Sequence, residues 1–182
     1  SVNQVFNIIN STVFPELQYE IGNGNMDSAR QLFRISIMVT LLVAAAGMLF
    51  LAVFGLNFYS IWTNNVLNPP ITMWYIFVLS VGFNALWWNS TIVFRATNQP
   101  YKMAVAGILS ACISVIATYI FSMYWGLVGA ALGAMILDLI LALYVLPACS
   151  HLLGQNPAII FNEFFTSDLV KMRRVFKMKF SR

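Results

Sequence analysis

Polar side chains form a stripe along an otherwise apolar stretch, residues 70–99 (PITMWYIFVLSVGFNALWWNSTIVFRATNQ). At 100° per residue of an α-helix, the stripe occupies about a quarter of the helix circumference. Its members are Ser80, Asn84, Trp87, Thr91, Arg95 and Asn98. An unpaired polar group in hydrocarbon costs several kcal/mol, so the stripe is expected to face other helices or a water-filled cavity. The stripe therefore suggests one wall of a transport path, around which the remaining helices are arranged.

A single acidic residue, Asp138, lies deep within the apolar run 126–148. Ionisable residues inside a membrane are costly and often functional. Asp138 could couple transport to an ion by exchanging a proton or binding a cation. Alternatively, a serine or threonine of a neighbouring span, such as Ser114, could satisfy its carboxyl group in a purely structural contact. Both interpretations remain open.

Two residues of the stripe could recognise a substrate directly. The Arg95 guanidinium could hold a phosphate through two parallel hydrogen bonds, or it could simply anchor the helix at the cytoplasmic interface. Trp87 could offer a stacking face to a sugar ring, although a tryptophan that only packs is the commoner case. Residues 1–15 add a second polar set at helical spacing, and we assign it to the same substrate path: Asn3, Asn7 and Asn10.

Other chemistry is weakly represented. The histidine, His151, has no Cys, Asp or Glu at metal-ligand spacing, and we expect no metal or other cofactor. Residues 22–24 (GNG) lack the strand–helix context and the lysine of a phosphate-binding loop. No nucleophile–base motif is present, so we do not expect an enzyme.

Composition predicts an all-α polytopic transmembrane helix bundle. Of 182 residues, 60% are hydrophobic and 9% are charged, against about 25% charged in a soluble domain. The mean hydropathy is +0.78. A helix needs about 20 apolar residues to cross a bilayer. The predicted bundle fills residues 1–150, with spans at approximately 1–15 (partial, ended by Pro15), 30–61, 70–97, 102–123 and 126–148.

The basic residues fall at alternate ends of successive spans. Arg30 and Arg34, then Arg95 and Lys102, then the six Lys and Arg residues of the tail 151–182 would share one side of the membrane. By the positive-inside rule this side is cytoplasmic. The tail would form a basic amphipathic helix on anionic membrane lipids, or it would be a solvated segment that only fixes topology.

Several segments together resemble a known family. These are a polar helix ending at Pro15, then GNGNMDSARQLFR, a long span, an Asn/Pro-rich loop, a span ending in RATNQPYK, and GLVGAALG opening the last helix. The chain from residue 1 to about 150 resembles the O-antigen and polysaccharide flippases of the multidrug/oligosaccharidyl-lipid/polysaccharide exporter superfamily. These motifs are loose and are shared with the multidrug and toxin extrusion (MATE) antiporters.

The resemblance implies a fold and a function. The chain would be most of the second lobe of a two-lobe MATE-like transporter, and its partner would be the N-terminal lobe of the same protein. It would flip an undecaprenyl-diphosphate-linked oligosaccharide across the bacterial inner membrane by alternating access. Arg95 is the candidate for the diphosphate, and H⁺ or Na⁺ coupling is the role suggested for Asp138.

Three alternatives follow from the same residues. A multidrug or cation antiporter of the same superfamily would bind its substrate with cavity carboxylates, for which Asp138 is the candidate. A membrane-embedded glycan polymerase, glycosyltransferase or acyltransferase would show catalytic residues in large loops. A non-transporting scaffold would use the stripe only for helix packing.

Overall fold

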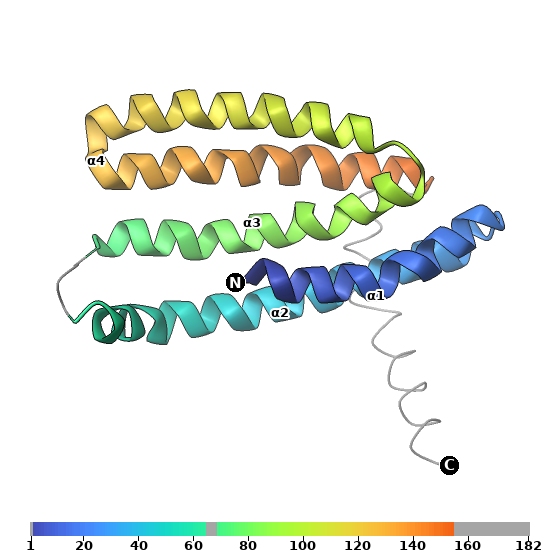
Figure 1. Cartoon of the computed structure of the whole chain (residues 1–182), viewed down its shortest axis with the longest axis horizontal. Helices are drawn as coiled ribbons and strands as arrows, with labels where there is room; N and C mark the ends of the chain where they lie inside the picture. Colours follow the sequence, from blue (N-terminus) through green and yellow to red (C-terminus); the bar gives the residue numbers. More distant parts are fainter. Residues whose placement is uncertain (1, 65–68, 155–182) are drawn as a thin grey trace, which may run out of the picture.

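The computed structural model describes residues 2–64 and 69–154, and this part of the chain is all-α. It contains α1 (Val2–Gly22), α2 (Met26–Trp62), α3 (Ile71–Ala96) and α4 (Pro100–Leu152), which lie side by side along one direction (Figure 1). Helices α2, α3 and α4 are long and apolar enough to cross a membrane, which confirms the prediction of such helices. The predicted amphipathic tail lies outside the described residues beyond residue 154.

Helix α4 reverses direction at Gly126, so it consists of two antiparallel segments (Figure 1). Gly126 has φ 56° and ψ −132°, a left-handed conformation that glycine adopts without a Cβ clash. The reversal separates the two predicted spans 102–123 and 126–148, and it falls at Gly126, the first residue of the second predicted span. The two segments of α4 therefore act as a helical hairpin.

Glycines let the two segments of α4 approach closely. A Cβ added at Gly129 would lie 1.9 Å from the Phe121 carbonyl oxygen, and one at Gly133 would lie 2.3 Å from the Thr118 Cα. The Ser114 hydroxyl donates a 2.8 Å hydrogen bond to the Gly133 carbonyl oxygen. The Gly-x-x-x-Gly spacing thus serves packing within the hairpin, as small residues do between membrane helices.

Helix α1 continues to Gly22, seven residues past the predicted end at residue 15. Pro15 lies inside the helix, where it removes one backbone donor. Leu17 is fully buried in the core, and Ile21 packs against the same core. Because this apolar face extends beyond the proline, tertiary packing continues the helix where local propensity predicts a stop.

Helix α3 is central, since it packs against α1, α2 and α4. Its Ile92, Val93 and Phe94 belong to a buried core with Phe33 of α2 and Val145 of α4. This confirms that the other described helices are arranged around the predicted helix of residues 70–97.

Four basic residues and four aromatic residues lie at opposite ends of the bundle, as their places at the ends of the helices show. We call them the charged end and the aromatic end. Among the described residues, the charged end carries Arg30, Arg34, Arg95 and Lys102, close to where α2 begins, α3 ends and α4 begins. The aromatic end carries Trp62, Trp74, Tyr124 and Trp125. This placement agrees with the alternation expected from the sequence.

Candidate functional site

The Asp138 carboxylate, on the second segment of α4, accepts hydrogen bonds from the stripe of α3. Ser80 Oγ donates to Asp138 Oδ2. Asn84 Nδ2 and Trp87 Nε1 donate to Asp138 Oδ1 over 3.0 Å and 2.8 Å. The donors are spaced i, i+4 and i+7, so successive turns of one helix face present them to a single carboxyl group. We call Asp138, Ser80, Asn84 and Trp87 the Asp138 cluster.

The cluster explains how an acidic residue is accommodated in an apolar helix. These partners are uncharged donors, and a carboxylate has only acceptor atoms, so donors and acceptors match. Ser114, the partner suggested from sequence, bonds Gly133 instead. The carboxyl group is thus held by α3, and α3 and α4 are joined at this point by polar contacts as well as by apolar packing.

A pocket of about 300 Å³ opens beside the cluster, between α1, α3 and α4. Its lining comprises Asn3, Phe77, Ser80, Val81, Asn84 and Asp138. Asn84 Oδ1 is buried without a hydrogen-bond partner among the described residues. Since a water molecule occupies about 30 Å³ in the liquid, the pocket has room for several waters or a hydrated ion beside the carboxylate.

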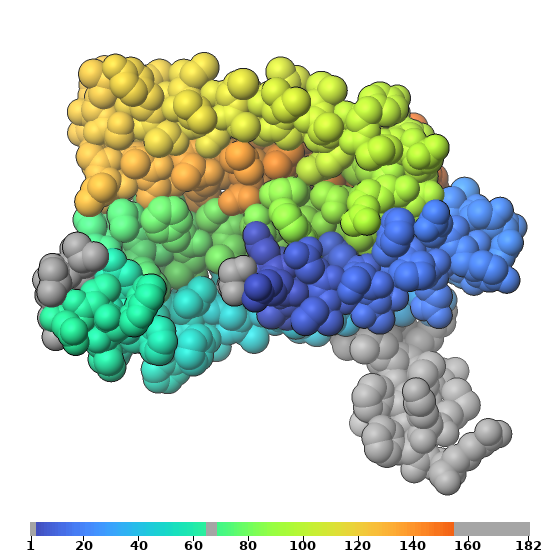
Figure 2. Space-filling view, in the orientation of Figure 1, coloured from blue at the N-terminus to red at the C-terminus, as the bar shows by residue number. Residues whose placement is uncertain are grey.

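The asparagines of α1 line the side of that helix that faces α3. Asn7 Oδ1 accepts a 2.9 Å hydrogen bond from Trp88 Nε1, and Asn10 Nδ2 donates to the Trp88 carbonyl oxygen over 3.2 Å. Asn3 reaches the pocket itself. In the space-filling view the start of α1 (dark blue) lies beside α3 (green), with the second segment of α4 (orange) beyond it (Figure 2). Of the α1 set, Asn3 therefore meets the stripe at the pocket, whereas Asn7 and Asn10 contact Trp88, which lies outside the stripe.

The part of the stripe toward the C-terminal end of α3, from Thr91 onward, lies outside the Asp138 cluster. Thr91 Oγ1 donates a 2.8 Å hydrogen bond to the Trp88 carbonyl oxygen. Arg95 is exposed, and its guanidinium carbon lies 4.7 Å from the centre of the Phe14 ring of α1, a cation–π contact. Its exposure leaves the guanidinium accessible to an anion at the charged end.

Asn98 has a backbone role at the end of α3. It has φ 56°, and its N–H donates to the Arg95 carbonyl oxygen, while the Gln99 N–H donates to that of Phe94. This is the Schellman arrangement, in which a left-handed residue closes a helix. The predicted stripe thus has three different roles. Its first three residues bind the Asp138 carboxylate, Arg95 presents a cation, and Asn98 closes the helix.

A second polar contact on α3 escaped the sequence analysis. Ser36 Oγ of α2 donates a 2.8 Å hydrogen bond to Asn89 Oδ1, and both residues are buried. Thr40 is also buried, and within the described chain neither its hydroxyl nor Asn89 Nδ2 has a hydrogen-bond partner. Asn89 lies 180° from Ser80 on the helix, so the stripe gave no signal for it. A polar residue isolated on an apolar helix face was the available clue.

Arg30 also has a role that charge patterning did not reveal. Its Nε donates to the Leu153 carbonyl oxygen over 2.7 Å, and Nη2 donates to that of Gly154 over 3.3 Å. These carbonyl groups follow the last turn of α4, where helical hydrogen bonds run out. Arg30 thereby ties the start of α2 to the end of α4 at the charged end.

Among residues 2–64 and 69–154, no group of three or more His, Cys, Asp or Glu is placed to hold a metal ion. Comparison of the chain with models of protein families, with curated proteins and with solved structures finds no match.

Proposed function

We propose that this chain forms most of one lobe of a membrane transporter that flips a polyprenyl-diphosphate-linked oligosaccharide. The observation that carries the proposal is the Asp138 cluster beside an open pocket. A polar helix face that only packed would be expected to close around its partner. Here Asp138, Ser80 and Asn84 line a space that also meets Asn3 of α1.

The polar groups suit a neutral, hydroxyl-rich ligand. Asparagine and serine side chains offer both donors and acceptors, as sugar hydroxyl groups require. Arg95 at the charged end offers a guanidinium, which matches a diphosphate through parallel hydrogen bonds. The proposed pathway runs from Arg95 toward the pocket, and the second lobe would complete its wall.

Location and orientation are part of the proposal. The charged end would face the cytoplasm of a bacterial cell, because basic residues are retained on that side of the inner membrane. Alternating access would expose the pocket to each side in turn. Asp138 would couple this movement to an H⁺ or Na⁺ gradient, since it carries a carboxyl group at the pocket.

One observation favours a second candidate, an antiporter of organic cations. Asp138 is a carboxyl group in contact with the pocket, and the lining that the structure describes contributes no Lys or Arg to oppose a cation. A carboxylate in a partly desolvated site would attract a lipophilic cation. In this case Arg95 would have no substrate role.

The test removes the gene for the complete transporter polypeptide in the cells that make it. For a flippase, the lipid-linked oligosaccharide should accumulate on the cytoplasmic leaflet, measured by lipid extraction and by resistance to an externally added glycan-cleaving enzyme. Re-expression of the wild-type protein should reverse this accumulation. For an antiporter, the lipid pool should be unchanged and sensitivity to lipophilic cations should rise. That second outcome would overturn the flippase proposal.

A further inference from the structure

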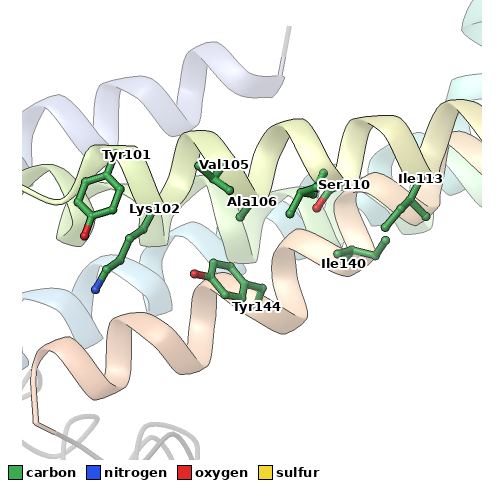
Figure 3. A pocket seen from close by; sticks show the side chains of 9 residues that line it. Tyr101, Lys102, Val105, Ala106, Ser110, Ile113, Ile140 and Tyr144 are labelled. Atoms are coloured by element: carbon green, nitrogen blue, oxygen red, sulfur yellow. The ribbon is translucent and has the colours of Figure 1, made fainter.

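A second pocket, of about 440 Å³, lies along α4 and is separate from the Asp138 cluster. We call it the α4 groove. Both segments of the helical hairpin line it, as Figure 3 shows for most of the lining. The lining residues are Tyr101, Lys102, Val105, Ala106, Leu109, Ser110, Ile113, Ile140 and Tyr144.

The α4 groove is polar at one end and apolar along its length. The Lys102 amine and the hydroxyl groups of Tyr101 and Tyr144 lie at the end nearest the start of α4 (Figure 3). Ile113 and Ile140 lie at the other end. The apolar wall is open to the surroundings, since Leu109 is 60% exposed and Ile113 is 50% exposed. An apolar surface with a cation at one end is complementary to an anionic amphiphile, whose apolar chain would lie along the surface and whose anionic headgroup would meet the cation.

The dimensions of the groove match one leaflet of a membrane. Ile113 lies twelve positions after Tyr101 on the helix, a rise of about 18 Å. One leaflet contributes about half of a hydrocarbon core roughly 30 Å thick. The polar end coincides with the charged end of the bundle, where Lys102 lies beside the end of α3. A phospholipid with its phosphate near Lys102 would therefore have its acyl chain at the same depth as the acyl chains of the surrounding leaflet.

We propose that the α4 groove binds an anionic phospholipid from the leaflet at the charged end. One acyl chain lies along Val105, Leu109 and Ile113, and the phosphate accepts hydrogen bonds from Lys102 and the two tyrosine hydroxyl groups. Tyrosine suits this boundary, since its ring is apolar and its hydroxyl is polar. The site does not depend on the proposed transport function, because it shares no lining residue with the Asp138 cluster.

The test uses native mass spectrometry of the purified full chain, delipidated and then titrated with dioleoylphosphatidylglycerol or dioleoylphosphatidylcholine. We expect one phosphatidylglycerol to be retained in preference to phosphatidylcholine. Lys102→Ala should weaken phosphatidylglycerol binding about fivefold, as expected for one basic residue near an anionic headgroup. Lys102→Arg should restore it. Ala106→Trp, which fills the groove, should weaken the binding of both lipids.

Matched variants separate this site from general attraction to lipid. Arg34→Ala removes the same charge from the same end of the bundle, and Ile116→Trp adds the same ring to an exposed position outside the groove. Neither should change phosphatidylglycerol retention. Circular dichroism and gel filtration of each variant verify that it is folded before lipid is added.

Three results would overturn the proposal. The first is equal retention of the two phospholipids by the wild-type chain. The second is an equal loss of binding in Lys102→Ala and Arg34→Ala. The third is dimerisation of the wild-type chain that Ala106→Trp abolishes, because a second copy would then occupy the groove.

Discussion

Helix α3 makes polar contacts on two opposite faces, toward α4 and toward α2. On the first face, Ser80, Asn84 and Trp87 donate to Asp138, and the residues are only partly buried beside a pocket. On the second, Asn89 and Ser36 form a pair that is 0% and 1% exposed. We call these the open face and the closed face.

The difference separates two uses of polar residues in an apolar bundle. The closed face joins α2 to α3 through two side chains that are both buried. Polar contacts of this kind in membranes contribute modestly, about 0.6 kcal/mol on average. The open face instead holds a carboxyl group beside a pocket of about 300 Å³. In the proposed function, this carboxyl group would lie on the transport path. Burial, rather than residue type, distinguishes the two faces.

The largest expected effect follows from Asp138→Asn on the open face. The amide keeps an acceptor oxygen for the α3 donors, so expression and helicity should change little. Loss of the charge should reduce flipping on the order of 100-fold, since a charge-assisted hydrogen bond contributes up to about 3 kcal/mol. Flipping is measured in proteoliposomes with and without an ion gradient.

A matched control is Glu16→Gln, which removes a carboxylate from an exposed position on α1. It should leave flipping unchanged. An Asp138→Asn variant with full, gradient-dependent flipping would show that the open face is structural, and the contrast with the closed face would then disappear.

The second-largest expected effect is a difference between the open face and the closed face in accessibility to a water-soluble reagent. In a background without Cys112 and Cys149, a cysteine at position 84 should react with a small water-soluble thiol reagent at least about tenfold faster than one at position 89. Reaction of the buried thiol requires local opening of the helix packing. Labelling is followed by mass spectrometry in proteoliposomes. Equal rates at the two positions would mean that no hydrated pocket lies beside Asn84.

The periodicity of the sequence predicts the apolar spans and the polar residues of the open face. A helical repeat is local, so the stripe on α3 and the apolar spans could be identified without knowledge of neighbouring helices. The partner of Asp138 could not, because its hydrogen bonds join α4 to α3 across more than 50 residues of sequence, and a local repeat carries no information on how two helices are aligned. The sequence suggests a serine or threonine of a neighbouring span, such as Ser114, as the donor, whereas the fold places Ser80 there.

Two further features depend on tertiary structure in the same way. The stop predicted at Pro15 fails because Leu17 and Ile21 find a core to pack against, which raises the stability of a helix that is locally unfavourable. The helical repeat of polar residues does not include the closed face, because Asn89 is an isolated polar residue on the apolar side of α3. Its isolation on an apolar helix face is a clue in the sequence, but its partner, Ser36, is identified only by the fold.

Arg95 extends the open face toward the charged end and gives a smaller expected effect. If the guanidinium meets a diphosphate, Arg95→Ala should reduce flipping about tenfold, and Arg95→Lys by less, because lysine keeps the charge without the planar fork. Transport of the lipid-linked oligosaccharide is the measurement. Phe14→Leu is the control, because it removes the ring under Arg95 but keeps the guanidinium. An equal loss in Phe14→Leu and Arg95→Ala would reduce Arg95 to a packing residue.

The smallest expected effect lies on the closed face. Ser36→Ala removes the donor to Asn89 Oδ1 and should lower stability by about 0.6 kcal/mol, and at most about 1.7 kcal/mol, measured by reversible unfolding in bicelles. Adding Asn89→Leu should recover most of this loss, because replacing both partners by apolar groups leaves neither of them with an unpaired polar atom. Flipping should stay at the wild-type level in both variants, since neither residue lines the pocket.

A loss of flipping in Ser36→Ala as large as in Asp138→Asn, at near-normal stability, would place the closed face in the transport path as well. The two faces would then belong to one polar network through α3, and burial would no longer separate structural from functional contacts.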